Sequence, residues 1–178
     1  MTLLAEKKPD VFQYEDILSL PEGHYEIVDG VKQSMSPTGF MHGLIEGKLF
    51  DFLDKHLSAK GFVAAGGVGI LISKSPLRVR GADIVYITKE SYPKPPAGIL
   101  ETPPELVAEI LSPANTAKEM NSKLRDYLSI GIPNIVFADF ENEIVTKYHS
   151  DGSFKIFSFS EEFVIYDTIK IQISTLLG

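Results

Sequence analysis

Hydrophobic and polar positions along the chain change their period several times, and each change predicts a different element. Between residues 41 and 59, apolar side chains recur with helical spacing, and most charged residues fall elsewhere. The apolar face of this segment comprises Ile45, Leu49, Phe52, Leu53 and Leu57. Gly61 follows it and is typical of a helix C-cap. A long helix is therefore expected over 41–59, with Gly61 ending it.

A second long helix is expected over residues 116–130. Thr116 and Glu119 have the spacing of a capping box, in which each side chain bonds the other residue's backbone amide. Gly131 and Pro133 follow the segment and favour a stop there. A shorter helical pattern covers residues 12–20.

Short runs rich in β-branched and aromatic residues predict strands between and after these helices. Run 79–87 is one expected strand, and run 106–111 is apolar except for Glu109, which is typical of a central strand covered on both faces. Because a helix connects run 106–111 to run 135–138, the two should be parallel. The other expected strands are 62–72, two hairpins over 25–35 and 143–159 with Asp-Gly at each turn, and the runs 163–166 and 169–173.

This order of elements predicts an α/β (α+β) fold, with a central mixed β-sheet flanked by helices and additional β-hairpins. A chain of 178 residues is long enough for one substantial core. We expect a single domain over residues 11–178 and a flexible segment over residues 1–10.

Composition narrows the classes of protein that need to be considered. The chain has no cysteine, which excludes disulfides and thiolate metal sites. No apolar run reaches the roughly 18 residues that span a bilayer, and the N-terminal charges do not fit a secretory signal. We therefore expect a cytoplasmic protein without a membrane segment. The net charge of −7 argues against gripping nucleic acid by bulk electrostatics, although a local basic cleft remains compatible with it.

Two acids stand out because they lie within or beside apolar strands. Asp83 and Glu109 are surrounded by Val, Ile and Leu, where a carboxylate is costly unless it is paired or bound to metal. Lys123 follows on the next helix. Two such carboxylates and a lysine suggest a hard-cation site for phosphate hydrolysis. The alternatives are that Asp83 pairs with a neighbouring arginine, Arg78 or Arg80, and that Lys123 pairs along its helix with Glu119.

Ordered fragments along about 140 residues resemble one bacterial family. They include Tyr25-Glu-Ile-Val-Asp-Gly30, His42-Gly43, Ala82-Asp-Ile-Val, Pro104-Glu-Leu-Val-Ala-Glu-Ile-Leu-Ser-Pro113 and Lys123-Leu-Arg-Asp-Tyr127. The chain resembles the PD-(D/E)XK nuclease superfamily and, within it, the family described as putative restriction endonucleases. This resemblance implies a restriction-endonuclease-like core and a metal-dependent DNA endonuclease that hydrolyses phosphodiester bonds.

The resemblance also implies roles for individual residues. Asp83 and Glu109 would ligate Mg²⁺ or Mn²⁺, and a lysine would position the attacking water. The sequence departs from the superfamily motif at Ala82, where a proline is expected, and at Leu111, where the lysine is expected. The resembling family takes its lysine from the following helix, which corresponds to Lys123 here.

Three readings stay open beside this one. His42 and Glu46, one helical turn apart, or Glu26 could complete the metal shell, or each could belong to an exposed polar face. The missing strand lysine and the acidic net charge allow a catalytically inactive nuclease-fold module that binds DNA or protein. A hydrolase of another phosphoester is the third possibility. We expect a homodimer, since two-fold symmetry suits the cutting of both strands of a duplex.

Overall fold

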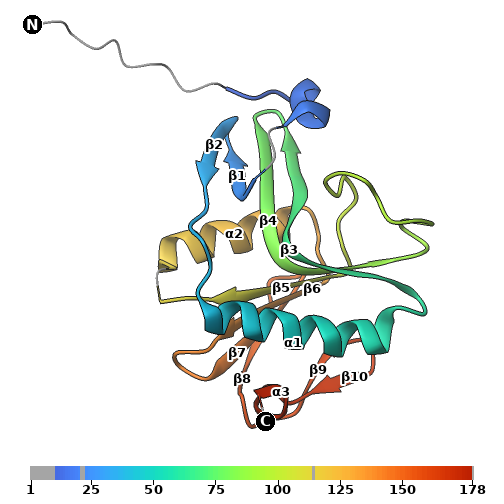
Figure 1. Cartoon of the computed structure of the whole chain (residues 1–178), viewed down its shortest axis with the longest axis vertical. Coiled ribbons are helices and arrows are strands. Elements are labelled where there is room, and N and C mark those ends of the chain that lie inside the picture. The colour runs from blue at the N-terminus through green and yellow to red at the C-terminus, as the bar shows by residue number, and fades with distance from the viewer. Residues whose placement is uncertain (1–10, 21–22, 114, 178) are drawn as a thin grey trace, which may run out of the picture.

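The computed structural model describes residues 11–20, 23–113 and 115–177, and the segment 1–10 predicted to be flexible lies outside them. An eight-stranded mixed sheet forms the centre, with the order β2-β1-β4-β5-β6-β7-β8 and with β3 paired to β4 (Figure 1). The helices are the 3₁₀ helix η1 (Tyr14–Ser19), α1 (Phe40–Leu57), α2 (Ala117–Ser129) and α3 (Ile173–Leu177). The strands are β1 (Tyr25–Val28), β2 (Val31–Ser34), β3 (Gly61–Lys74), β4 (Leu77–Thr88), β5 (Leu106–Leu111), β6 (Asn134–Asp139), β7 (Ile144–His149), β8 (Phe154–Ser158), β9 (Phe163–Tyr166) and β10 (Ile169–Ile171).

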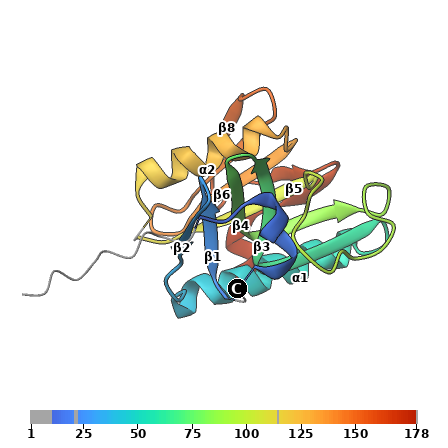
Figure 2. The same cartoon turned by 90° about the horizontal axis from the view of Figure 1, so that it is seen from above.

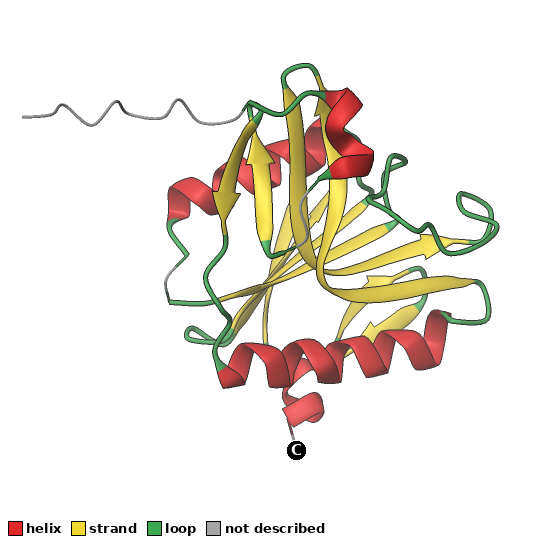
Figure 3. Cartoon of the chain, turned by 45° about the horizontal axis from the view of Figure 1, so that its top comes forward, coloured by secondary structure: helices red, strands yellow, loops and turns green. Residues whose placement is uncertain are grey.

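The two long helices cover opposite faces of the sheet, which lies between them (Figures 2 and 3). Helix α1 buries Ile45, Leu49, Leu53 and Leu57, the positions that its sequence period predicts. Helix α2 packs on the other face through Tyr127, which is fully buried. The small sheet of β9 and β10 adds to the core under α1. None of the helices in the described ranges is long and apolar enough to cross a membrane.

The expected pairings are confirmed. Strands β5 and β6 are parallel and are connected by α2. The first hairpin turns at Asp29 and Gly30, whose φ angles of 54° and 79° are the positive values that a type I′ turn requires. Thr116 and Glu119 form the predicted capping box at the start of α2.

The prediction that Gly61 ends the first helix is wrong. Ser58 is the C-cap of α1, and Gly61 is the first residue of β3. A Cβ atom at Gly61 would lie 2.2 Å from the Ile87 carbonyl oxygen and 2.4 Å from the Tyr86 ring. Glycine is needed here because β4 passes too close for any side chain.

Along one edge of β4 the pairing with neighbouring strands is interrupted, and the candidate site lies at this interruption. One of its edges pairs with β3 along nearly its whole length. The other edge is shared, because β1 pairs at Val79 and β5 pairs only from Ile84 to Tyr86. Residues 80–83 therefore face a gap between β1 and β5 that no other described strand fills.

Candidate active site

Asp83 and Glu109 lie where β4 and β5 diverge. The ladder between these strands ends at the pair Ile84 and Ala108, so the two acids occupy the next positions. Beyond the end of the ladder, the Ile110 amide donates a hydrogen bond to Asp83 Oδ2 at 2.7 Å. The Asp83 side chain thus takes the place of a backbone carbonyl as acceptor. Both acids are buried, with exposed fractions of 8% and 4%. The structure thus brings together the two carboxylates that the sequence singled out.

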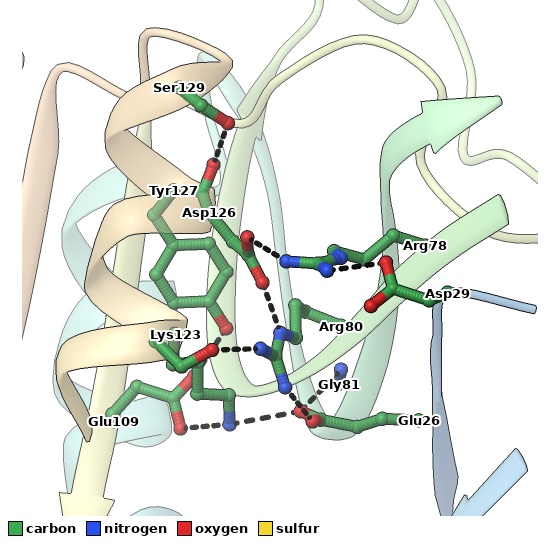
Figure 4. A network of polar contacts seen from close by, with 11 residues as sticks. Glu26, Asp29, Arg78, Arg80, Gly81, Glu109, Lys123, Asp126, Tyr127 and Ser129 are labelled. Carbon is green, nitrogen blue, oxygen red and sulfur yellow. Dashed lines mark hydrogen bonds and ion pairs between the residues drawn. The ribbon is translucent and has the colours of Figure 1, made fainter. Parts of the chain in front are cut away.

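Glu109 points toward α2, where both of its oxygens are engaged (Figure 4). Lys123 Nζ donates to Oε2 at 2.8 Å, and the Tyr127 hydroxyl donates to Oε1 at 2.5 Å. Burial raises the pKa of Glu109 to about 7, although Lys123 and the Tyr127 hydrogen bond act in the opposite direction. Lys123 reaches Glu109 from the next helix, as the motif comparison predicted.

Lys123 lies between two carboxylates. Its Nζ is also 3.5 Å from Oε1 of Glu26 on β1. Burial alone would lower the pKa of Lys123, but Glu109 and Glu26 outweigh it and raise the pKa above its usual value. The ammonium is therefore held charged at the site.

Two arginines of β4 connect the site to α2 (Figure 4). Arg80 donates to Glu26 Oε2 and to Asp126 Oδ2, both at 2.6 Å. Arg78 donates to Asp126 Oδ1 at 2.7 Å and to Asp29 Oδ1 at 2.6 Å. Neither arginine pairs with Asp83, so the alternative interpretation of Asp83 as a local ion-pair partner has no support in these contacts. We call Glu26, Arg80, Glu109, Lys123, Asp126 and Tyr127 the α2-side cluster.

Asp83 instead faces α1. His42 Nε2 lies 3.5 Å from Asp83 Oδ1 and 3.9 Å from Glu46 Oε2, and it is a buried atom without a hydrogen-bond partner. The facing Asp83 carboxylate raises the pKa of His42, and burial together with the Asp83 charge raises the pKa of Glu46. We call His42, Glu46 and Asp83 the α1-side cluster.

Both clusters border one pocket with a volume of about 360 Å³. Among the residues lining it are Glu26, His42, Arg80, Asp83, Glu109 and Lys123. Sequence reasoning missed Arg80, Asp126 and the hydroxyl of Tyr127 as parts of the site. One signal was present, since Ser122, Asp126 and Ser129 place polar side chains on one face of α2 beside its apolar stripe.

The side chains around the pocket carry the atom types that bind divalent cations, but they are not arranged as a formed metal site. Within the described ranges, no three His, Asp or Glu side chains already form a metal cluster. Glu109 is held by Lys123 and Tyr127. Asp83 Oδ1 and the unpartnered His42 Nε2, however, face one another at the pocket wall. Oxygen and imidazole donors of this kind are ordinary ligands of divalent ions.

A family model, Uma2, described as "putative restriction endonuclease", matches residues 11–175. The fold is similar to the crystal structure of a putative nuclease belonging to DUF820 from Anabaena variabilis ATCC 29413. The TM-score is 0.78 at 15% identity, over 93% of this chain and 97% of that chain. No curated protein matches. The predicted mixed sheet between helices is thereby confirmed as a nuclease-like fold.

Proposed function

Since the chain belongs to the Uma2 family of putative restriction endonucleases, we propose that it is a metal-dependent endonuclease that hydrolyses phosphodiester bonds in DNA. The observation that carries this proposal is the meeting of Asp83, Glu109 and Lys123 at one pocket. Buried carboxylates beside a held cation, in a cleft, mark a candidate catalytic site. A nuclease acting on cellular DNA would work in the cytoplasm, as the sequence predicts.

Asp83 and Glu109 would hold the cation, Mg²⁺ or Mn²⁺. When bound, such an ion supplies Lewis-acid polarisation of the phosphate and a lowered pKa for a bound water. The Ile110 amide fixes one oxygen of Asp83 and leaves the other facing the pocket. On the opposite side, Tyr127 donates to one oxygen of Glu109 and Lys123 donates to the other, so Glu109 would reach the ion through an oxygen that it shares with one of these donors.

Lys123 supplies the positive charge of the protein itself. Its ammonium lies at the pocket wall and stays protonated between Glu109 and Glu26. In that position it would orient the attacking water or stabilise the negative charge that develops on the phosphate, an electrostatic role. A long flexible side chain on α2 can thus replace a lysine at the position of Leu111 on β5.

The experiment that tests this proposal is incubation of supercoiled plasmid with the protein and Mg²⁺ or Mn²⁺. Wild type should nick the plasmid, and Asp83→Asn, Glu109→Gln and Lys123→Met should each reduce the rate at least about 100-fold, the scale of losing one electrostatic catalytic group. The matched controls are Asp51→Asn on α1 and Lys118→Met on α2, both at exposed positions. They should retain the wild-type rate.

Absence of nicking with either metal, in protein that still shifts DNA in a gel, would favour the inactive nuclease-fold module. Turnover of small phosphodiesters without nicking would favour a different phosphoester substrate. Equal loss in the two control variants would contradict the residue assignment.

A homodimer forms part of the same proposal. Strand β8 is at the end of the sheet order and exposes Phe154 and Ile156, each by more than half. Phe159 N donates a hydrogen bond to Glu143 O, which sets the alternation along β8. The backbone groups of Phe154 and Ile156 therefore point away from β7. An apolar edge strand of this kind can pair with a second copy. Ile156→Lys should convert a dimer to a monomer in sedimentation analysis, and an unchanged mass would contradict this interface.

A further inference from the structure

The α1-side cluster contains an unexplained atom. His42 Nε2 is buried and makes no hydrogen bond, and the two nearest carboxylate oxygens, of Asp83 and Glu46, lie 3.5 and 3.9 Å away. A buried polar atom without a partner is destabilising and rare in folded proteins, so it calls for a physical explanation. The described chain offers no other side-chain atom in this condition.

A closed His–Asp ion pair does not explain the arrangement. Charge-assisted bonds between nitrogen and carboxylate oxygen are short, about 2.7–2.9 Å. Arg80 and Lys123 each reach a carboxylate oxygen of the same pocket at 2.6 and 2.8 Å. The separation of His42 Nε2 from Asp83 Oδ1 is 3.5 Å. His42 therefore does not form the short ion pair with a carboxylate that Arg80 and Lys123 form in the same pocket.

Both carboxylates are fixed so that one oxygen stays available. Asp83 Oδ2 accepts from the Ile110 amide, and Glu46 Oε1 accepts from the Gly66 amide, each at 2.7 Å. Gly66 can donate there because it lies in a bulge of β3, with φ at +97°. Backbone amides that hold one oxygen while the other faces inward are a common support for metal ligands.

We propose that His42 Nε2 and Asp83 Oδ1, with Glu46 Oε2 beside them, are ligands of the divalent ion, and that the imidazole makes the site prefer a first-row transition ion to Mg²⁺. This inference rests on the proposed function, which assigned Asp83 and Glu109 to the metal, and it adds a nitrogen ligand from α1. Neighbouring ligands around one octahedral ion with bonds of about 2.1 Å lie about 3 Å apart. The observed separations of 3.5 and 3.9 Å are longer, so the side chains would have to move closer to hold one ion.

The preference follows from ligand chemistry. Carboxylate, carbonyl and water oxygens suit Mg²⁺ and Mn²⁺ alike, whereas an imidazole nitrogen adds affinity for transition ions rather than for Mg²⁺. Neutral imidazole through Nε2 is a very common metal ligand in proteins. Replacement of His42 should therefore lower the affinity for a transition ion more than the affinity for Mg²⁺.

The test is Mn²⁺ binding to the full chain, followed by electron paramagnetic resonance. The free-ion signal gives the dissociation constant, and electron spin echo modulation reports a directly bound ¹⁴N nucleus. Wild type should show the nitrogen coupling. His42→Ala should lose it and bind Mn²⁺ about tenfold or more weakly, while Mg²⁺ affinity measured by competition changes less.

Two further variants make the result specific. His56→Ala removes an exposed imidazole from the same helix and should leave both the coupling and the affinity unchanged. His42→Glu restores an oxygen ligand, so it should bind without nitrogen coupling and shift the preference toward Mg²⁺. Circular dichroism melting of each variant shows whether the fold is retained.

Mn²⁺ bound without nitrogen coupling, with equal affinity in wild type and His42→Ala, would overturn the inference and leave a carboxylate-only nuclease site standing. Absence of Mn²⁺ binding would overturn it as well, and the plasmid assay would then decide the nuclease proposal separately. Nitrogen coupling in a protein that cuts no DNA would retain the ligand assignment and refute the nuclease.

Discussion

The two halves of the pocket differ in how fully their polar atoms are paired. In the α2-side cluster, both oxygens of Glu109 and both oxygens of Asp126 accept bonds of 2.5–2.8 Å from buried or half-buried donors. In the α1-side cluster, each acid has one oxygen bonded to a backbone amide and the other without a bonded cation. His42 Nε2 lies between these two free oxygens.

The paired charges of the α2-side cluster stabilise the fold, whereas the unpaired atoms of the α1-side cluster are available to a ligand. Pairing holds the α2-side cluster in one arrangement, and removal of a charged partner there leaves a buried charge with fewer contacts. The α1-side cluster is incomplete at His42 Nε2, so removal of this imidazole breaks no hydrogen bond of that nitrogen. A ligand site needs donor atoms that are free to bind and surroundings that hold them in place. The α1-side cluster supplies the first and the α2-side cluster the second.

The largest effect is expected when the α2-side cluster loses its central cation. Arg80→Met leaves Glu26 and Asp126 buried with one cation fewer, and the free energy of unfolding should fall by about 3–5 kcal/mol. Urea denaturation at pH 7 measures it. Arg78→Met is the matched control, because Arg78 is more exposed and Asp126 keeps Arg80 as partner. It should lose about 1 kcal/mol; equal losses would mean that burial does not distinguish the two pairs.

Next in size is a pH effect at Glu109. Folding raises its pKa from 4.5 to about 7 through burial. A carboxyl with a raised pKa stabilises the fold fully below its unfolded pKa, and this contribution is lost as the pH rises through about 7. Glu109→Gln lacks that loss. Its free energy of unfolding relative to wild type should rise by on the order of 2–3 kcal/mol between pH 5 and pH 8.

Urea midpoints at these two pH values check the expectation for Glu109. Glu161→Gln serves as control, because Glu161 is exposed and its pKa is lowered, so it should show no trend over this range. A difference between Glu109→Gln and wild type that stays constant with pH would refute the prediction.

A smaller loss is expected at Tyr127. Tyr127→Phe removes the hydroxyl that donates to Glu109 Oε1 and leaves a buried carboxylate oxygen unpaired, at a cost of about 1–2 kcal/mol. In a Glu109→Gln background, Tyr127→Phe should cause a smaller loss in the free energy of unfolding. A double-mutant cycle by urea denaturation measures this coupling. Tyr148→Phe, on β7, should show no coupling to Glu109. Additive effects of Tyr127 and Glu109 would exclude the bond as a stabilising contact.

The smallest effect is expected in the α1-side cluster. His42→Gln keeps the side-chain length and a polar atom near the position of Nε2 and breaks no hydrogen bond of that nitrogen, so the free energy of unfolding in the presence of a chelator should change by less than about 1 kcal/mol. Added Mn²⁺ should then raise the melting temperature of wild type more than that of the variant. A loss in chelator comparable to that of Tyr127→Phe would place His42 among the structural residues.

Residues with a local signal could be predicted from the sequence. Asp83 and Glu109 are conspicuous because each interrupts an apolar strand, and the capping box at Thr116 sets the start of the helix that brings Lys123 to them. Periodicity likewise located α1 to within one residue at its start and two at its end. These features depend on neighbours along the chain.

Arg80, Asp126 and Tyr127 could not be predicted, because their partners are set by tertiary structure. Arg80 meets Glu26 only because β1 and β5 share one edge of β4 and leave a gap that α2 covers. Gly61 was misread for the same reason, since the requirement for glycine comes from Tyr86 on the neighbouring strand. The free nitrogen of His42 is a further tertiary property, because it depends on where the Asp83 and Glu46 side chains are anchored.

The position of Lys123 on α2 also sets when, during folding, the site would be complete. In a strand motif, an acid and its lysine two residues apart would be neighbours even in a half-made chain. Here they are separated by 14 residues and meet only when α2 has packed on the finished sheet. A nascent chain, a denatured copy or a proteolytic fragment ending before α2 therefore carries the acids without the cation. Under the proposed function, the activity would therefore appear only when α2 has packed on the sheet.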